Sequence, residues 1–234
     1  MKLNGATIPD DVVARVLARR GSLHCFAALD PVRTALVVID LQRAFMDESV
    51  GHAVIPAARD IVPAVNRVAE AVRMGGGAVF WVKNTHDARC LDEWSVAQAM
   101  ATPGMRQRRI EAMSANTAGH ALWPTLDVRD EDAVVLKYRF SAFLPGASEL
   151  PRMLRARGFD TVLIAGTVTN VCCESSARDA MMTNFRTIML SDANAAATQA
   201  EHDASLTAFY NVFGDVMDSH MVIGCLRDPA AAQR

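Results

Sequence analysis

The chain has 234 residues, of which 51% are hydrophobic, and its 24 basic and 26 acidic residues give a formal net charge of −2. This length and composition suit an α/β domain with a sizeable core, and the interspersed, nearly balanced charge disfavours nucleic acid or an anionic membrane as partner. We therefore expect a small-molecule partner. Because the start lacks a signal-peptide pattern and no apolar run could span a bilayer, we also expect a cytoplasmic protein.

The predicted elements begin with a helix, DDVVARVLARRG, in an N-terminal extension over residues 1–30 that packs on the body or on a neighbouring subunit. A single domain is expected over residues 31–234. In it, short β-branched apolar runs alternate with amphipathic segments, and these runs are predicted strands: 34–40, 77–83, 132–137, 161–166, 186–192 and 219–225. Strands that are apolar on both faces and separated by helices indicate a three-layer α/β/α sandwich with a mainly parallel, roughly six-stranded sheet.

Three intervening segments have apolar residues at helical spacing: IPAARDIVPAVNRVAEAVRMGGG, SELPRMLRARGF and CCESSARDAMMTNF. In the second, Gly158 is expected to end the helix. Residues 84–131 are polar and contain Pro103-Gly104 and Pro124 as breakers. Such a long excursion after a strand predicts an irregular insertion that encloses substrate or contacts another subunit.

The five cysteines do not form a disulfide framework, and the adjacent Cys172 and Cys173 could pair only with strain. Reduced thiols are therefore expected. No CxxC and no paired Cys/His spacing of the zinc type is present. The sequence thus predicts neither a metal site nor a cofactor.

Three reactive side chains follow predicted strands: Asp40 after the first, Lys137 after the third, and a cysteine in GTVTNVCC after the fourth. Singly, each has a plain structural alternative, as a helix cap, a solvated strand terminus or a packing residue. Ligands of open parallel sheets bind beyond the carboxyl ends of the strands, and an acid, an amine and a thiol form a working nucleophile set. The first turn of a helix and a nearby Lys137 would lower the cysteine pKa, and Asp40 could accept its proton.

Helical spacing distinguishes the two sulfurs. Cys173, Ala177 and Met181 recur at four-residue intervals and form an apolar row suited to packing on the sheet. Cys172 is rotated by about 100° and aligns with the polar Ser176, closer to the cleft at the strand ends. Cys172 is therefore the predicted nucleophile.

The segments VVIDLQRAF, VLKYRFSAF and IAGTVTNVCCESSARDA resemble the three landmark segments of the isochorismatase-like cysteine hydrolases, and the resemblance covers about residues 34–225. It is most similar to the ureidoacrylate and related N-carbamoyl amidohydrolases. The resemblance implies a catalytic triad of Asp40, Lys137 and Cys172. It also implies a homodimer or homotetramer.

The same resemblance implies a non-proline cis peptide, placed here between Val168 and Thr169, that aims the Thr169 and Cys172 amides into an oxyanion hole. Nicotinamidases of this superfamily carry a metal-binding Asp-x-His after the catalytic aspartate. Asp47 and His52 lack that spacing, and His86 is expected to be a loop or pocket residue. A nicotinamidase is therefore the less favoured member.

The leading hypothesis is a cysteine hydrolase that cleaves a C–N bond of a small amide, ureido or N-carbamoyl compound through a thioester. The alternatives are an isochorismatase-type vinyl ether hydrolase, which needs no thiol, a nicotinamidase, and a non-enzymatic dinucleotide-binding or scaffold domain. The last lacks the G-x-G-x-x-G motif after the first strand. Candidate residues of the substrate pocket are Phe45, Trp81, Asn84, Tyr138 and Phe143.

Overall fold

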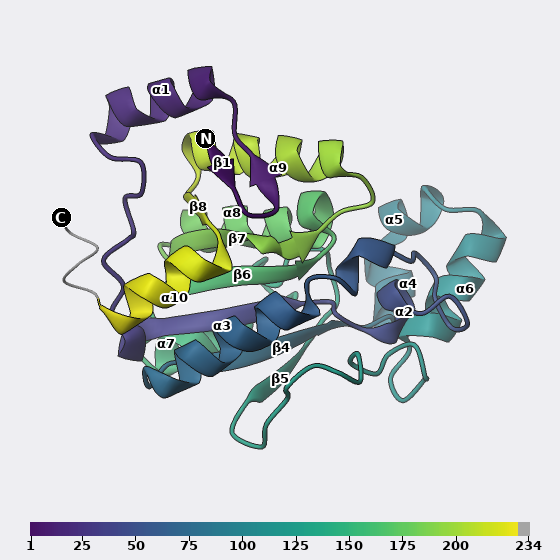
Figure 1. Cartoon of the computed structure of the whole chain (residues 1–234). Coiled ribbons are helices and arrows are strands. Elements are labelled where there is room, and N and C mark those ends of the chain that lie inside the picture. Colours follow the sequence, from purple (N-terminus) through teal and green to yellow (C-terminus); the bar gives the residue numbers. More distant parts are fainter. Residues whose placement is uncertain (229–234) are drawn as a thin grey trace.

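A parallel six-stranded sheet forms the centre of the computed structural model, which describes residues 1–228, apart from the side chains of residues 88, 89 and 91 (Figure 1). The strands follow the spatial order β5-β4-β3-β6-β7-β8. Their bounds are β3 Thr34–Ile39, β4 Ala78–Asn84, β5 Ala133–Lys137, β6 Thr161–Thr167, β7 Arg186–Ala195 and β8 Asp215–Met217. A separate antiparallel hairpin at the N-terminus pairs β1 (Lys2–Leu3) with β2 (Ala6–Thr7). The predicted α/β fold with a parallel sheet is confirmed.

Helices cover both faces of this sheet. One face carries α3 (Val62–Met74) and α10 (Ser219–Arg227), and the other carries α7 (Leu150–Ala156), α8 (Glu174–Met182) and α9 (Gln199–Val212). Helix α1 (Asp10–Arg20) ends at Gly21 in the left-handed conformation and packs on α9, where Arg20 donates to the carbonyl oxygens of Tyr210 and Gly214. The extension therefore docks on its own chain. Gly158, with φ +77°, follows α7 as expected.

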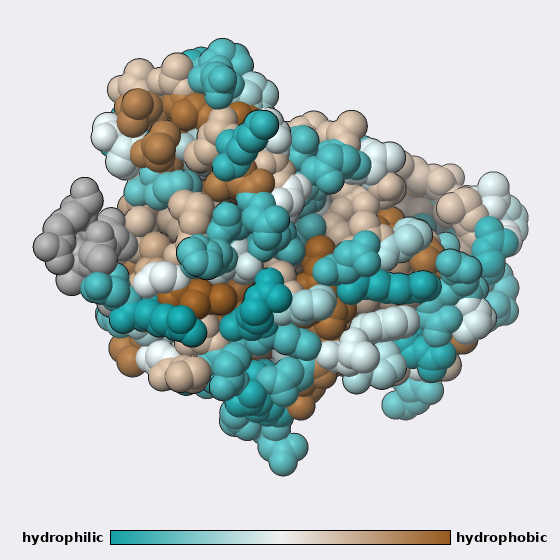
Figure 2. All heavy atoms as spheres, viewed as in Figure 1, coloured by the Kyte–Doolittle hydropathy of each residue, from teal (hydrophilic) through white to brown (hydrophobic). Residues whose placement is uncertain are grey.

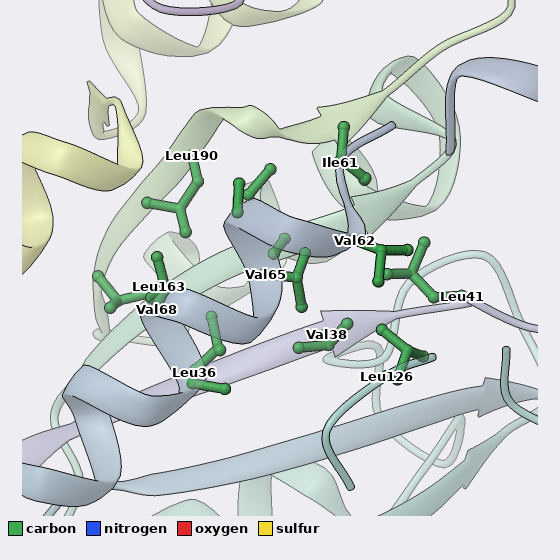
Figure 3. Close-up of a cluster of buried hydrophobic side chains, with 14 of the residues drawn as sticks. Leu36, Val38, Leu41, Ile61, Val62, Val65, Val68, Leu126, Leu163 and Leu190 are labelled. Atoms are coloured by element: carbon green, nitrogen blue, oxygen red, sulfur yellow. The ribbon is translucent and has the colours of Figure 1, made fainter. Parts of the chain in front are cut away.

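Strand β3 shows why both layers are needed, because all six of its residues are buried. Successive side chains of a strand point to opposite faces, so Leu36 and Val38 join one core cluster while Val37 and Ile39 join the other. Figure 3 shows Leu36 and Val38 beneath α3, whose Val65 and Val68 point toward the sheet. A continuous apolar run is therefore the pattern of a strand covered on both sides.

The prediction of a strand over residues 219–225 is wrong, because this segment is helix α10. The side chain of Asp218 caps it by accepting a hydrogen bond from the amide of Met221 at 2.8 Å. Val222 and Leu226 are both buried and stand four residues apart, the spacing of one helix face. The sixth strand is instead β8, three residues that lie directly before this cap.

The stretch 84–131, predicted to be irregular, contains three helices: α4 (Ala88–Glu93), α5 (Ser95–Ala99) and α6 (Pro103–Met113). Helix α6 begins as proline and threonine favour, since Pro103 occupies its first turn and Thr102 accepts from the amide of Met105. Figure 1 shows these helices together with α2 (Arg43–Met46) beyond the carboxyl ends of β3 and β4. The short turns are η1 (Pro31–Arg33), η2 (Pro56–Ala58) and η3 (Thr169–Cys173).

The surface mixes polar and apolar residues, and Figure 2 shows hydrophilic residues spread over much of the face seen in Figure 1. Apolar residues gather on the α1 segment at the top of that view. Leu17 and Leu23 of this segment are 46% and 41% exposed. In the described part of the chain, no helix is both long enough and apolar enough to cross a membrane.

Candidate active site

Asp40 directly follows β3 and is completely buried. Its backbone has φ +57°, a left-handed conformation that aspartate tolerates better than most residues. The amide of Asp40 donates to the carbonyl oxygen of Val82, and its own carbonyl oxygen accepts from the amide of Gln42 at 2.7 Å. The chain thus turns sharply at the strand end and holds the carboxylate inside the molecule.

Lys137 is the last residue of β5 and is also completely buried. Its Nζ lies 2.9 Å from Asp40 Oδ2 and donates to Cys172 Sγ at 3.5 Å and to the carbonyl oxygen of Arg139 at 3.1 Å. Because β4 lies between β5 and β3, the long lysine side chain spans a strand to make these contacts. The structure therefore brings together the three predicted residues Asp40, Lys137 and Cys172.

The turn that carries Cys172 begins with a cis peptide bond between Thr167 and Val168, one residue earlier than predicted. The predicted Val168–Thr169 position is wrong because Val168 is already the N-cap of the π-helical turn η3. The carbonyl oxygen of Val168 accepts hydrogen bonds from the amides of Val171 and Cys173, as at the start of a helix. Gly166 lets β6 approach β3 here, since an added Cβ would lie 2.0 Å from the carbonyl oxygen of Ile39.

The two cysteines differ in their surroundings, as the helical spacing indicated. Cys172 is 4% exposed and contacts Lys137, whereas Cys173 is completely buried. The buried row continues from Cys173 through Ala177 to Ala180 rather than to Met181, which is 37% exposed. Ser176 is buried as well, because its Oγ accepts from the amide of Ala142 at 3.0 Å.

Burial dominates the electrostatics of this group. It raises the pKa of the Cys172 thiol to about 12, although Lys137 acts in the opposite direction. Burial likewise raises the pKa of the Asp40 carboxyl, and the Lys137 ammonium offsets only part of this effect. For Lys137, burial opposes the charged form, but Asp40 and Cys172 outweigh it and raise the pKa. The resting sulfur is therefore a neutral thiol rather than the thiolate that its position near a helix start suggested.

One of the five pocket candidates lies beside these residues. Asn84, whose Cα pairs with that of Lys137, is 3% exposed, and its Oδ1 has no hydrogen-bond partner among the described residues. It shares a sheet face with Val82, a member of the core cluster that contains Cys172. Phe45 is buried in α2 with its ring centroid 6.0 Å from that of His52, and it belongs to the other core cluster.

The other three candidates are not brought to the site. Trp81 lies on the opposite sheet face from Lys137, and its Nε1 donates to Asp132 at 2.8 Å. Phe143 packs edge-on against Phe185, which precedes β7 and so marks the amino end of the sheet. Tyr138 borders a cavity of about 440 Å³ along the edge strand β5, together with Val134, Leu136 and Arg152.

A brace from α9 holds the turn around Cys172, and sequence reasoning missed it. His202 Nδ1 lies 2.8 Å from Thr169 Oγ1, and His202 Nε2 lies 3.0 Å from the carbonyl oxygen of Ser191. A carbonyl oxygen can only accept, so Nε2 carries the proton and Thr169 donates to Nδ1. Ser205, one turn further along α9, donates to Glu174 at 2.6 Å. No local sequence pattern predicts these contacts, because about 30 residues separate the partners in the chain.

Gln42 ties the ends of two neighbouring strands together. Its Nε2 donates to the carbonyl oxygens of Asn84 and His120, and its Oε1 accepts from the amide of Asn84 at 2.7 Å. All of these groups are buried, so each bond is costly to lose. The glutamine of the DLQ segment therefore fixes Asn84 relative to Asp40, a role that its motif alone did not reveal.

Asp47, which was considered for a metal site, has other partners. Asp47 accepts from the Ser49 hydroxyl and pairs with Arg43 at 2.6 Å, and these contacts, Ser49 first, lower its pKa to about 2. Within residues 1–228, no group of three or more His, Cys, Asp or Glu side chains is arranged to hold a metal ion. The expectation of a reaction without a metal stays a prediction.

Acid should destabilise this fold through its buried histidines. Burial lowers the pKa of His120 to about 4, and His120 is 4% exposed. The folded state therefore keeps a neutral ring, whereas the unfolded chain binds a proton below about pH 6.5. Stability is fully present above that pH and is lost as the pH falls toward 4. The unfolding free energy, measured by urea denaturation, should fall between pH 7 and pH 5. We expect His120→Gln to reduce this fall by up to about 2 kcal/mol. If the unfolding free energy of this variant falls as much as that of the parent, the pKa of His120 is the same in the folded and unfolded states.

A carboxylate, an amine and a thiol thus meet at the carboxyl ends of β3, β5 and the β6 turn, in a site sealed from water. This arrangement, on a parallel sheet with helices on both faces, defines the class as an α/β/α-sandwich enzyme with a buried cysteine.

The isochorismatase domain family matches residues 34–221, and the chain belongs to this family. It is 32% identical over 222 residues to ureidoacrylate amidohydrolase RutB from Methylobacterium radiotolerans, covering 88% of this chain and 84% of that protein. A cysteine hydrolase from Pseudomonas syringae pv. phaseolicola has a TM-score of 0.74 and 27% identity, covering 86% of this chain and 96% of that one. N-carbamoylsarcosine amidase from Thermoplasma acidophilum has a TM-score of 0.64 and 27% identity, covering 80% and 96%.

These comparisons confirm the resemblance stated from the three landmark segments. They also confirm the predicted enzyme class, a hydrolase of carbon–nitrogen bonds other than peptide bonds.

Proposed function

We propose that the protein is a cysteine amidohydrolase that cleaves a small amide, ureido or N-carbamoyl compound through a thioester at Cys172. The observation that carries this proposal is the buried Lys137 ammonium, which contacts both the Asp40 carboxylate and the Cys172 sulfur. A core that only needed filling would not bury an acid, an amine and a thiol together, because each costs desolvation free energy.

In the first half of the reaction, Asp40 accepts the thiol proton while Cys172 Sγ forms a bond to the substrate carbonyl carbon. The raised pKa of the Asp40 carboxyl makes it a stronger base than an exposed aspartate. The negative charge that develops on the carbonyl oxygen is received by the amides of Thr169 and Cys172. The assignment to Thr169 and Cys172 is supported by the other amides of the turn. Those of Val171 and Cys173 already donate to the carbonyl oxygen of Val168.

In the second half, the C–N bond breaks and Asp40 gives its proton to the leaving nitrogen, which departs as ammonia or an amine. The thioester remains on Cys172. Asp40 then takes a proton from water as the water oxygen attacks the thioester carbon. When the C–S bond breaks, Asp40 returns this proton to the leaving sulfur, which restores the thiol and the carboxylate. Lys137 keeps its proton throughout and holds the carboxylate beside the sulfur. The names of the relatives, ureidoacrylate amidohydrolase and N-carbamoylsarcosine amidase, support a C–N bond of this kind.

An ammonia-release assay tests the proposal, with N-carbamoyl amino acids, ureido acids, carboxamides including nicotinamide, and isochorismate as the panel. We expect ammonia from members of the first three groups and none from isochorismate. Acid quenching during turnover should trap a protein whose mass is raised by the acyl group, and peptide mapping should place the addition on Cys172. Turnover of isochorismate alone, or an acyl group on another residue, would contradict the proposal.

We also propose that the enzyme acts in the cytoplasm as a homodimer or homotetramer, without nucleic acid or membrane as partner, and that residues 1–30 extend a hydrolase domain over 31–234. The free state of Cys25, Cys90, Cys172, Cys173 and Cys225 supports a reducing compartment. The exposed leucines of the α1 segment support a contact between subunits. The match of the family from residue 34 onward supports the domain division.

A further inference from the structure

Helix α6 presents two arginines on its inner side. Arg106, Arg109 and Met113 stand three and four residues apart, so they lie on one face of the helix. Met113 is 1% exposed, and both arginines are half-buried. An arginine on the inner face of a helix normally finds a carboxylate, because a buried charge without a partner is costly.

Arg109 has no such partner. Among the described residues, its guanidinium makes no hydrogen bond or ion pair, and burial lowers its pKa. The groups that it influences are the rings of His52 and His86, whose pKa values are lowered to about 4 by burial first and by Arg109 next. Both rings are therefore neutral near pH 7, and the positive charge of Arg109 stays uncompensated beside them.

Backbone contacts connect this helix to the catalytic side chains. The amide of Thr85 donates to the carbonyl oxygen of Lys137, and the amide of His86 donates to that of Met113, one turn after Arg109. His86 is 3% exposed, and its Nδ1 is buried without a hydrogen-bond partner among the described residues. Lys137 also contributes to the lowered pKa of His86. The histidine with the unpartnered Nδ1 is thus connected through Thr85 to Lys137 and through its own amide to α6.

An aromatic residue, Trp94, covers the ring of His86. The ring of Trp94, between α4 and α5, stacks on the His86 ring at 6.3 Å, and Phe140 contacts Trp94 edge-on at 4.8 Å. The guanidinium of Arg139 lies over the same indole. His52 and Arg109 keep partial exposure, whereas the triad is sealed. Arg109 therefore presents a positive charge at a partly exposed position, beside two neutral imidazoles.

We propose that Arg109, with His86 beside it, binds a carboxylate of the substrate and makes the enzyme select acidic ureido or amide compounds over neutral ones. A guanidinium matches a carboxylate with two parallel hydrogen bonds, and a neutral imidazole can donate a third without adding charge. This inference rests on the proposed amidohydrolase function and adds to it a residue that determines specificity.

Two probes test it: N-carbamoylglycine, and 2-hydroxyethylurea, in which a hydroxymethyl group replaces the carboxylate. In the Cys172→Ala protein, which cannot turn over, Arg109→Gln should weaken binding of the acid about 10- to 100-fold by calorimetry. Binding of the neutral probe should change less than about twofold. The matched control is Arg108→Gln, which removes the same charge from an exposed position of α6 that influences His52 but is not among the main causes of the lowered pKa of His86, and it should leave both affinities unchanged.

Kinetics with Cys172 intact give the second measurement. Arg109→Gln should raise KM for the acid with little change in kcat, because the contact is made equally before and during the reaction. Arg109→Lys should recover part of the loss. Equal effects on the two probes, no effect on either, or failure of the Cys172→Ala protein to bind the acid would overturn this inference. Absence of ammonia release with intact acid binding would instead count against the proposed function alone.

Discussion

Replacing Cys172 with alanine is expected to lower kcat/KM for amide hydrolysis by at least about 10⁴-fold, because the step that forms the thioester has no other nucleophile. The fold should survive, since the change removes a single buried atom and leaves the backbone hydrogen bonds of the turn in place. Circular dichroism and the urea midpoint measure the fold, and ammonia release measures the activity.

The neighbouring cysteine supplies the matched control. Cys173→Val places an apolar side chain of similar size in a fully buried position of the core, whereas the hydrogen bond from Lys137 goes to Cys172. Activity should stay within a few-fold of the parent, and stability within about 1.5 kcal/mol. The nucleophile would have to be reassigned if the Cys173 variant lost activity while the Cys172 variant kept it.

The second large effect concerns the buried ion pair. Lys137→Met should destabilise the protein by about 3–5 kcal/mol at pH 8, because it leaves the Asp40 carboxylate buried without its counter-charge. Asp40 can relieve this cost by taking up a proton, and its pKa is raised in the folded state. The destabilisation is therefore fully present above the folded pKa of Asp40 and declines as the pH falls toward the ordinary aspartate value. Urea midpoints measured from pH 8 down to pH 5 would follow this change.

Two further variants make the measurement specific. Asp40→Asn/Lys137→Met should be more stable than Lys137→Met alone at pH 8, since no charge is then left unpaired. Arg33→Met breaks an exposed pair with Asp160 at 2.7 Å and should cost no more than about 1 kcal/mol. Equal costs for the exposed and the buried pair would mean that Asp40 is neutral in the parent protein.

Activity should respond to the same residues as a unit. Asp40→Asn, Lys137→Met and Cys172→Ala should each lower kcat/KM by orders of magnitude, and the triple variant should be little worse than the poorest single one. Losses that add independently would show that the three side chains do not share one reaction coordinate.

The sequence by itself determined the sheet and the residues at its carboxyl edge. A strand covered on both faces must be apolar at nearly every position, so β3, β4, β6 and most of β7 were visible as continuous runs. The residue after such a run lies at the strand end whatever the strand order, which is why Asp40 and Lys137 could be placed. Cys172 could be separated from Cys173 because helical spacing is also a local property.

Only the tertiary structure decided what depends on partners distant in the chain. A run that is apolar on both sides does not mark the face that holds the site, so Trp81 was indistinguishable from Phe80 until β4 was placed in the sheet. The sequence of residues 219–225 is compatible with a helix and with a strand. The structure has a helix there, and the side chain of Asp218 caps its first turn. The pKa of Cys172 depends on burial by every layer around it, which outweighs the helix start and Lys137. Arg109 stands in a polar helix that looks solvent-exposed in sequence, and its inward position follows from the docking of α6 on the residues after β4.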